Sequence, residues 1–340
     1  MFDFFGGRVA KKPSGTFYRH IFADAWRIVR TNKALWVLGF FVSFLGNGGV
    51  YELLVQGTGR LGLRDDFGGF ASLGLIPGWN NVAGALQNIG AANFVVLLLV
   101  GLTALALAIV AVWVVVSAQG GLIVGVRDAA RGRKTRFGSL FAAGNETFGP
   151  LFLLNVLSRL AIMAFFYLLL ALTVLYLADA NIWSVLAYLA GFVLLIPITL
   201  IIGFSSIYAA CYITIQRLPL VAAIEAAIAL FRKYWLISLE TAFFLFGINL
   251  LAAFGIGVVT GAAAIAFIPF LIGASLLKST IALTVVAALA ALVGVVFLAG
   301  VGAFLAAFQY AVWVSLFNKL HVRGHGGLSK ITRWFHKLLA

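Results

Sequence analysis

Residues 94–118 read FVVLLLVGLTALALAIVAVWVVVSA, a stretch without a single charged side chain. A helix needs about 20 predominantly apolar residues to cross the ~30 Å hydrocarbon core of a bilayer. This stretch is long enough, and a helix satisfies the backbone polar groups where no water is present. The sequence here predicts a membrane-spanning helix and places the chain in the all-α class.

Comparable apolar stretches recur along the chain. Of its 340 residues, 63% are hydrophobic and 10% are charged, against about 25% charged in a typical soluble domain. Lipid as the outer solvent explains so few charges. We expect a polytopic transmembrane helical bundle with six spans, at residues 34–55, 94–118, 151–178, 184–212, 235–273 and 281–316.

The fifth span is longer than a helix perpendicular to the membrane requires. A division at residues 255–261 would leave almost no connecting loop. One long helix is therefore the preferred interpretation, and two segments are the alternative.

Lys and Arg residues indicate the orientation, because they accumulate in cytoplasmic loops. Of the 24, twenty fall in residues 1–33, in the connections after the second and fourth spans, and in the tail 317–340. The other side has only Arg60, Arg64 and Lys278, with residues 56–93 as an external loop. We expect a multi-pass protein of the cell (inner) membrane with both termini in the cytoplasm.

The net charge of +14 is explained by the same distribution. Cytoplasmic cations suit anionic lipid headgroups, so nucleic acid is not an expected partner. Candidate headgroup-binding residues are Arg27, Arg30, Lys33, Arg133, Lys134, Arg136, Arg232 and Lys233.

Basic, amphipathic stretches precede the first, third and fifth spans, at residues 17–30, 137–144 and 219–234. Helices of this kind rest their apolar face at the headgroup boundary. The pattern predicts three repeats, each an interfacial helix followed by a transmembrane hairpin. The interfacial helices either fix topology alone or form a cytoplasmic collar that binds lipid or a partner.

Residues 25–41, AWRIVRTNKALWVLGFF, resemble the opening of a loose group of bacterial six-span membrane proteins. That group includes the membrane-domain family named after glycerophosphoryl diester phosphodiesterases. Residues 120–132 and 222–245 are similar to its later repeats. The resemblance implies a six-span fold. It does not imply phosphodiesterase activity, because no soluble phosphodiesterase domain is present.

No catalytic motif is recognisable. The chain has no Gly-rich phosphate loop, no His-Glu-x-x-His zinc motif and no Gly-x-Ser-x-Gly elbow. Its single cysteine, Cys211, excludes an internal disulfide and a cysteine-based metal site. His321 and His325 are four apart, but glycines interrupt the helix that a two-His site would need. We expect a non-enzymatic protein without metal or cofactor.

Polar side chains within the spans are costly and therefore informative. Arg159 and Glu240 lie roughly 13 Å and 8 Å deep from the cytoplasmic side, at ~1.5 Å per residue. With Asn155 and Gln309 they form a candidate intramembrane polar cluster. Three interpretations are open: contacts that fix helix register, a ligand or headgroup pocket, and a proton or ion path.

Small residues mark candidate helix contacts. Gly121 and Gly125, like Gly257 and Gly261, have the spacing that lets helix backbones approach closely.

The preferred function is a lipid-interacting scaffold or an accessory subunit of a membrane complex, with a protein partner or a second copy of the chain. The alternative is a transporter or channel-like protein for a small molecule or lipid, with its site around Arg159 and Glu240. Pro197 and the glycines in residues 46–49 and 255–261 favour this alternative, because interrupted helices line transporter sites. A lipid-modifying enzyme ranks last, since clustered carboxylates or histidines near an interface are missing.

Overall fold

The computed structural model describes residues 17–47, 91–178, 181–276 and 280–323. All regular structure within these ranges is helical, which confirms the all-α prediction. The elements are α1 (Phe17–Thr31), α2 (Ala34–Val42), the π-helical turn η1 (Ser43–Asn47), α5 (Ala91–Ala130), α6 (Phe137–Asn145), α7 (Phe148–Ala178), α8 (Ile182–Gln216), α9 (Leu220–Leu276) and α10 (Thr280–Arg323).

Five helices, α5, α7, α8, α9 and α10, are long and apolar enough to cross a membrane. The chain is therefore a multi-pass integral membrane protein. The five helices contain the second to sixth predicted spans, in that order. The predicted first span, residues 34–55, is described only as far as Asn47, and its remainder lies outside the described residues.

The α1–α2 elbow bends the chain by 106°. Inside it, the Asn32 side-chain amide donates to the Ile28 carbonyl and the Trp36 indole N–H donates to the Val29 carbonyl, both at 2.8 Å. Together, α1 and α2 are long and apolar enough to count as one broken span, which would raise the number of candidate spans among the described residues from five to six.

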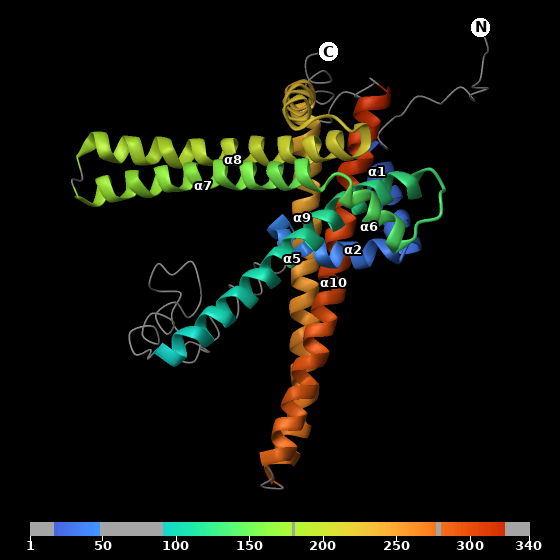
Figure 1. Cartoon of the computed structure of the whole chain (residues 1–340), viewed down its shortest axis with the longest axis vertical. Coiled ribbons are helices and arrows are strands. Elements are labelled where there is room, and N and C mark those ends of the chain that lie inside the picture. Colours follow the sequence, from blue (N-terminus) through green and yellow to red (C-terminus); the bar gives the residue numbers. More distant parts are fainter. Residues whose placement is uncertain (1–16, 48–90, 179–180, 277–279, 324–340) are drawn as a thin grey trace, which may run out of the picture.

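Buried side chains gather at one end of the molecule, where all the helices converge (Figure 1). They come from α1, from residues 115–126 of α5, 204–214 of α8 and 303–320 of α10. We call this region the packed end. The basic α5–α6 connection and the end of α8 adjoin it, so the cations of these two connections lie on this side.

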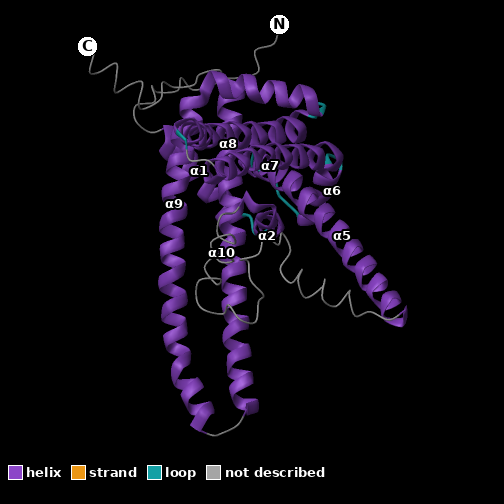
Figure 2. Cartoon of the chain, turned by 90° about the vertical axis from the view of Figure 1, so that its left-hand side faces the viewer, coloured by secondary structure: helices purple, strands orange, loops and turns teal. Residues whose placement is uncertain are grey.

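Three arms leave the packed end in different directions: α5, the α7–α8 hairpin and the α9–α10 hairpin (Figures 1 and 2). None of the described side chains in residues 95–114 and 182–203 is buried. These lengths correspond to ~30 Å and ~33 Å of helix, the thickness of the bilayer's hydrocarbon core. Leu107 is 66% exposed and Phe254 73%, as side chains surrounded by lipid would be. The predicted bundle is thus tight at the packed end and open along the arms.

The apolar face of α1 packs on neighbouring helices. Its apolar side chains Ile21, Ala25 and Val29 are fully buried, and the helix packs against α10 and α5. Protein, and not the headgroup boundary, covers this apolar face. The reason is that α10 continues beyond the membrane-length arm and gives α1 an apolar surface to pack on.

α9 is a single helix from a kink at Tyr234 (φ −127°, ψ 27°) to Leu276, without a break at residues 255–261. α8 likewise continues through Pro197. The three amphipathic stretches fall in α1, α6 and the part of α9 before the kink. Their equivalence as three repeats stays a prediction.

Three glycines allow helix backbones to touch at the packed end. A Cβ atom on Gly144 of α6 would overlap the Ser117 carbonyl of α5, and one on Gly39 of α2 would overlap the Ala303 carbonyl of α10. On the α5 side, a Cβ on Gly121 would lie 2.6 Å from the Leu140 carbonyl oxygen. α6 and α2 are therefore held against the long helices at backbone contact.

Candidate functional site

The four residues of the predicted intramembrane cluster have different partners. Arg159 Nη2 in α7 donates to the Leu45 carbonyl in η1 at 2.6 Å, whereas the buried Glu240 in α9 accepts from the Tyr18 hydroxyl of α1. Among the described residues, no ion pair joins Arg159 to Glu240. Each contact links two elements, as the register-fixing interpretation expects, and a ligand-binding role stays a prediction.

Asn155 and Gln309 also bond across helices. The Gln309 amide in α10 donates to Asn249 in α9 at 3.0 Å. Asn155 in α7 donates at 2.6 Å to the side-chain oxygen of Gln119 in α5. The side-chain nitrogen of Gln119 donates to the Tyr310 hydroxyl of α10 at 3.2 Å. Gln119 is buried, so these bonds replace the water that its amide would otherwise contact. One amide thereby links three long helices.

The eight predicted headgroup-binding residues are all exposed at the packed end. They come from the α1–α2 elbow, the α5–α6 connection and the kink of α9, and we call them the basic collar: Arg27, Arg30, Lys33, Arg133, Lys134, Arg136, Arg232 and Lys233.

Contacts of the collar within the chain are weak. Arg27 lies 3.5 Å from Asp24 and Arg133 lies 3.8 Å from Asp128. Lys233 stands over the Tyr234 ring, 5.3 Å from its centroid. Exposed pairs of this kind contribute little to stability, about 0–1 kcal/mol. The collar therefore leaves its charges available to anions outside the chain.

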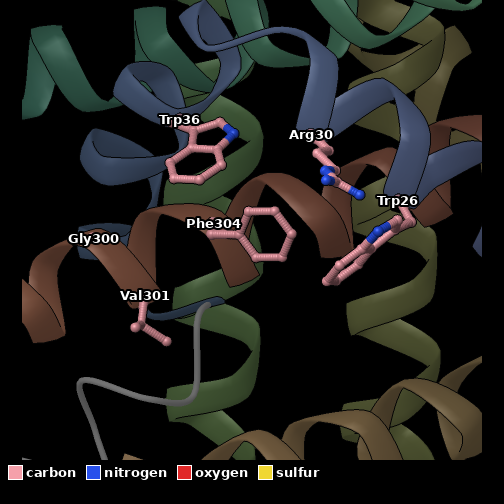
Figure 3. A pocket seen from close by; sticks show the side chains of 6 residues that line it. All are labelled: Trp26, Arg30, Trp36, Gly300, Val301 and Phe304. Carbon is pink, nitrogen blue, oxygen red and sulfur yellow. The ribbon is translucent and has the colours of Figure 1, made fainter.

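A groove lies between the α1–α2 elbow and α10 (Figure 3). Its volume is about 380 Å³, within the range of small-molecule sites. The Phe304 ring centroid is 5.1 Å from the ring centroids of both Trp26 and Trp36, in edge-to-face contacts. We call it the elbow groove, lined by Trp26, Arg30, Trp36, Gly300, Val301 and Phe304.

Of the residues that line this groove, only Arg30 was among the site residues predicted from the sequence. A signal was present, since Trp26 and Trp36 flank the basic residues 27–33 and tryptophan is enriched at membrane interfaces. Nothing in the sequence indicated that residues 300–304 would lie opposite them.

In the part of the chain that the structure describes, no three metal-ligating side chains come together. The His321 ring stacks on Phe317, with its Nε2 2.8 Å from the Gln216 amide nitrogen. His325 lies outside the described residues.

No family model matches the chain, and no curated protein or solved structure is significantly similar to it. The resemblance of residues 25–41 to the bacterial six-span group therefore stays a prediction. The features that bear on function are the packed end, the basic collar and the elbow groove.

Proposed function

We propose that this protein is a non-enzymatic membrane scaffold or accessory subunit that binds anionic lipids at the cytoplasmic face of the cell membrane. The basic collar is the observation that supports this function. Its eight exposed cations lie on the packed end, at the α1–α2 elbow, the α5–α6 connection and the kink of α9. A Lys or Arg close to an anionic leaflet gains about 1 kcal/mol. Several such residues on one helical core favour anionic lipids around it.

The contrast between the packed end and the arms supports the scaffold role. The packed end joins α1, α2 and the five long helices through buried apolar contacts and bonds such as those of Gln119. The arms expose apolar helix faces, and Gly257 and Gly261 on α9 face open space. Close approach of another helix at small residues stabilises contacts in membranes. A neighbouring membrane protein or a second copy of the chain fits such faces.

Native mass spectrometry of the full chain, extracted gently with its own lipids, tests this function. We expect retained anionic phospholipids and a protein partner or second copy. Replacing Arg133, Lys134 and Arg136 together by Gln should lower anionic-lipid retention, by roughly fivefold for each charge at ~1 kcal/mol. The substituted residues are exposed, so the variant should fold normally.

Retention of zwitterionic phospholipid is the internal control and should not change in the triple variant. Anionic-lipid retention equal to that of the wild type would contradict the lipid-binding role. A particle that is always monomeric and without any protein partner would contradict the scaffold role.

The alternative function, transport, is supported neither by a polar site that Arg159 and Glu240 share nor by an interruption of α8 or α9 among the described residues. Arg159 and Glu240 bond to different elements of the chain. α8 and α9 continue as helices through Pro197 and residues 255–261, where interruptions would have favoured a transporter site.

A further inference from the structure

The elbow groove lies about one hydrocarbon-core thickness along α10 from the start of that helix. Gly300 is about 20 residues from Thr280, the first residue of α10, which is ~30 Å at 1.5 Å per residue. That distance equals the thickness of the hydrocarbon core. If the tip of the α9–α10 hairpin lies at the outer boundary, Gly300 and Val301 lie at the inner one, and Phe304 and Arg30 lie just beyond it.

Arg30 provides the groove with a cation. No carboxylate of the described residues lies within ion-pair distance of its guanidinium, whereas the neighbouring Arg27 pairs with Asp24. Figure 3 shows the Arg30 side chain extending over the space between Trp26 and Phe304. An arginine in this position can donate two parallel hydrogen bonds to a phosphate group.

Trp26 supplies a second donor. Its ring is 51% exposed, and Figure 3 shows its indole nitrogen on the side that faces Arg30. The other indole of the groove is used within the chain, because Trp36 Nε1 donates to the Val29 carbonyl. Among the bonds of the described residues, the Trp26 N–H has no acceptor, so it is available to a ligand beside Arg30.

Below these donors the groove is apolar. Its floor is formed by Phe304, Val301 and Gly300, and a Cβ on Gly300 would meet no atom within 4 Å. Gly300 has no side chain and is exposed, so the surface of α10 beside the groove is open. A molecule that suits the whole groove has a phosphate at one end and a hydrocarbon chain at the other.

We propose that the elbow groove binds one anionic phospholipid, with its phosphate on Arg30 and the Trp26 N–H and an acyl chain along Val301 and Gly300. This inference rests on the proposed lipid-binding function and specifies one site for it. Lipid tails are as apolar as the groove wall, so the acyl contact gives little preference over bulk lipid. Selectivity comes from the headgroup, and the nearby Arg27 and Lys33 favour a net negative charge.

The test is a native mass spectrometry titration of the delipidated full chain with phosphatidylglycerol and, separately, phosphatidylcholine of the same acyl chains. We expect one phosphatidylglycerol to bind more tightly than the rest and more tightly than phosphatidylcholine. Arg30→Gln should weaken this tightest site at least about tenfold, as expected for a charge-assisted bond. Trp26→Phe, which keeps the ring, should weaken it by a smaller factor.

Gly300→Leu should weaken the tightest site, because the leucine side chain would occupy the open space beside Val301 where the acyl chain is proposed to lie. Its matched control is Gly294→Leu on the same helix, where a Cβ also meets no atom within 4 Å but the residue does not line the groove. Arg19→Gln is the matched charge control on α1, because Arg19 is exposed and belongs neither to the groove nor to the basic collar. Both controls should leave the tightest site unchanged, and equal melting temperatures should show that all the variants fold.

Unchanged phosphatidylglycerol binding in Arg30→Gln and Gly300→Leu would overturn the assignment. Tighter binding of phosphatidylcholine would also overturn it, because the aromatic rings would then hold a quaternary ammonium group instead. If only the triple variant of the α5–α6 connection loses anionic lipid, the collar function stands and the groove does not. If no variant changes anionic-lipid binding, both fail.

Discussion

Gly144→Ala is expected to destabilise the packed end by at least about 2 kcal/mol, because an added methyl group has less room here than at any other glycine that the structure describes. Its Cβ would overlap the Ser117 carbonyl and crowd the Gly121 backbone nitrogen. Both neighbours are backbone atoms, so no side-chain rotation relieves the clash. α6 would have to separate from α5, which exposes the buried Leu140. Thermal unfolding of the purified full chain in detergent measures the loss.

Gly138→Ala is the matched control, since it makes the same change in the same helix. A Cβ on Gly138 meets no atom within 4 Å. Alanine has the higher helix propensity, so this variant should be as stable as the wild type or more stable by up to about 1 kcal/mol. Equal effects of the two substitutions would show that α6 does not touch α5 through Gly144.

Gln119→Leu is expected to cost about 2–4 kcal/mol, because it removes the acceptor of the Asn155 amide and a donor to the Tyr310 hydroxyl in a buried site. Leucine has a similar size, so loss of volume contributes little. The free energy of unfolding in a denaturant titration of the full chain is the appropriate measurement. The three helices that these bonds join should separate more readily in the variant.

Thr103→Val provides the comparison for Gln119→Leu. Thr103 is an exposed residue of the same helix, and its hydroxyl donates to the Leu99 carbonyl of its own α5. Its replacement should change stability by no more than about 0.5 kcal/mol. A Gln119→Leu variant as stable as Thr103→Val would mean that the Asn155 and Tyr310 bonds do not stabilise the packed end.

Hydropathy was sufficient to predict where the long helices lie, because each needs an uninterrupted apolar run whatever surrounds it. It could not predict where they pack, because side chains that face lipid and side chains that face protein are equally apolar. Gly121 and Gly257 illustrate this. Both belong to pairs spaced four residues apart, yet Gly121 lies against Leu140 while Gly257 faces open space.

The partners of the predicted intramembrane polar cluster could not be read from the sequence either. The depths of Arg159 and Glu240 could be calculated from their positions in the spans, but their directions around the helix axes could not. Glu240 bonds to Tyr18, 222 residues away, and Arg159 to the Leu45 carbonyl. The elbow groove was missed because the 106° bend that brings Trp26 and Trp36 against Phe304 leaves no hydropathy signal.

Cysteine labelling tests most directly whether the packed end lies in the cytoplasm and the tips of the arms lie on the other side of the membrane. The only native cysteine, Cys211, is buried and can be replaced by Ala. Single cysteines would then be placed at Ser139 in α6 at the packed end and at Ile182 at the tip of the α7–α8 hairpin, both exposed. We predict that a membrane-impermeant maleimide labels Ile182→Cys in intact spheroplasts and Ser139→Cys only after permeabilisation. Labelling of Ser139→Cys in intact spheroplasts, or of both positions from the same side, would contradict a cytoplasmic packed end with arms that span the membrane.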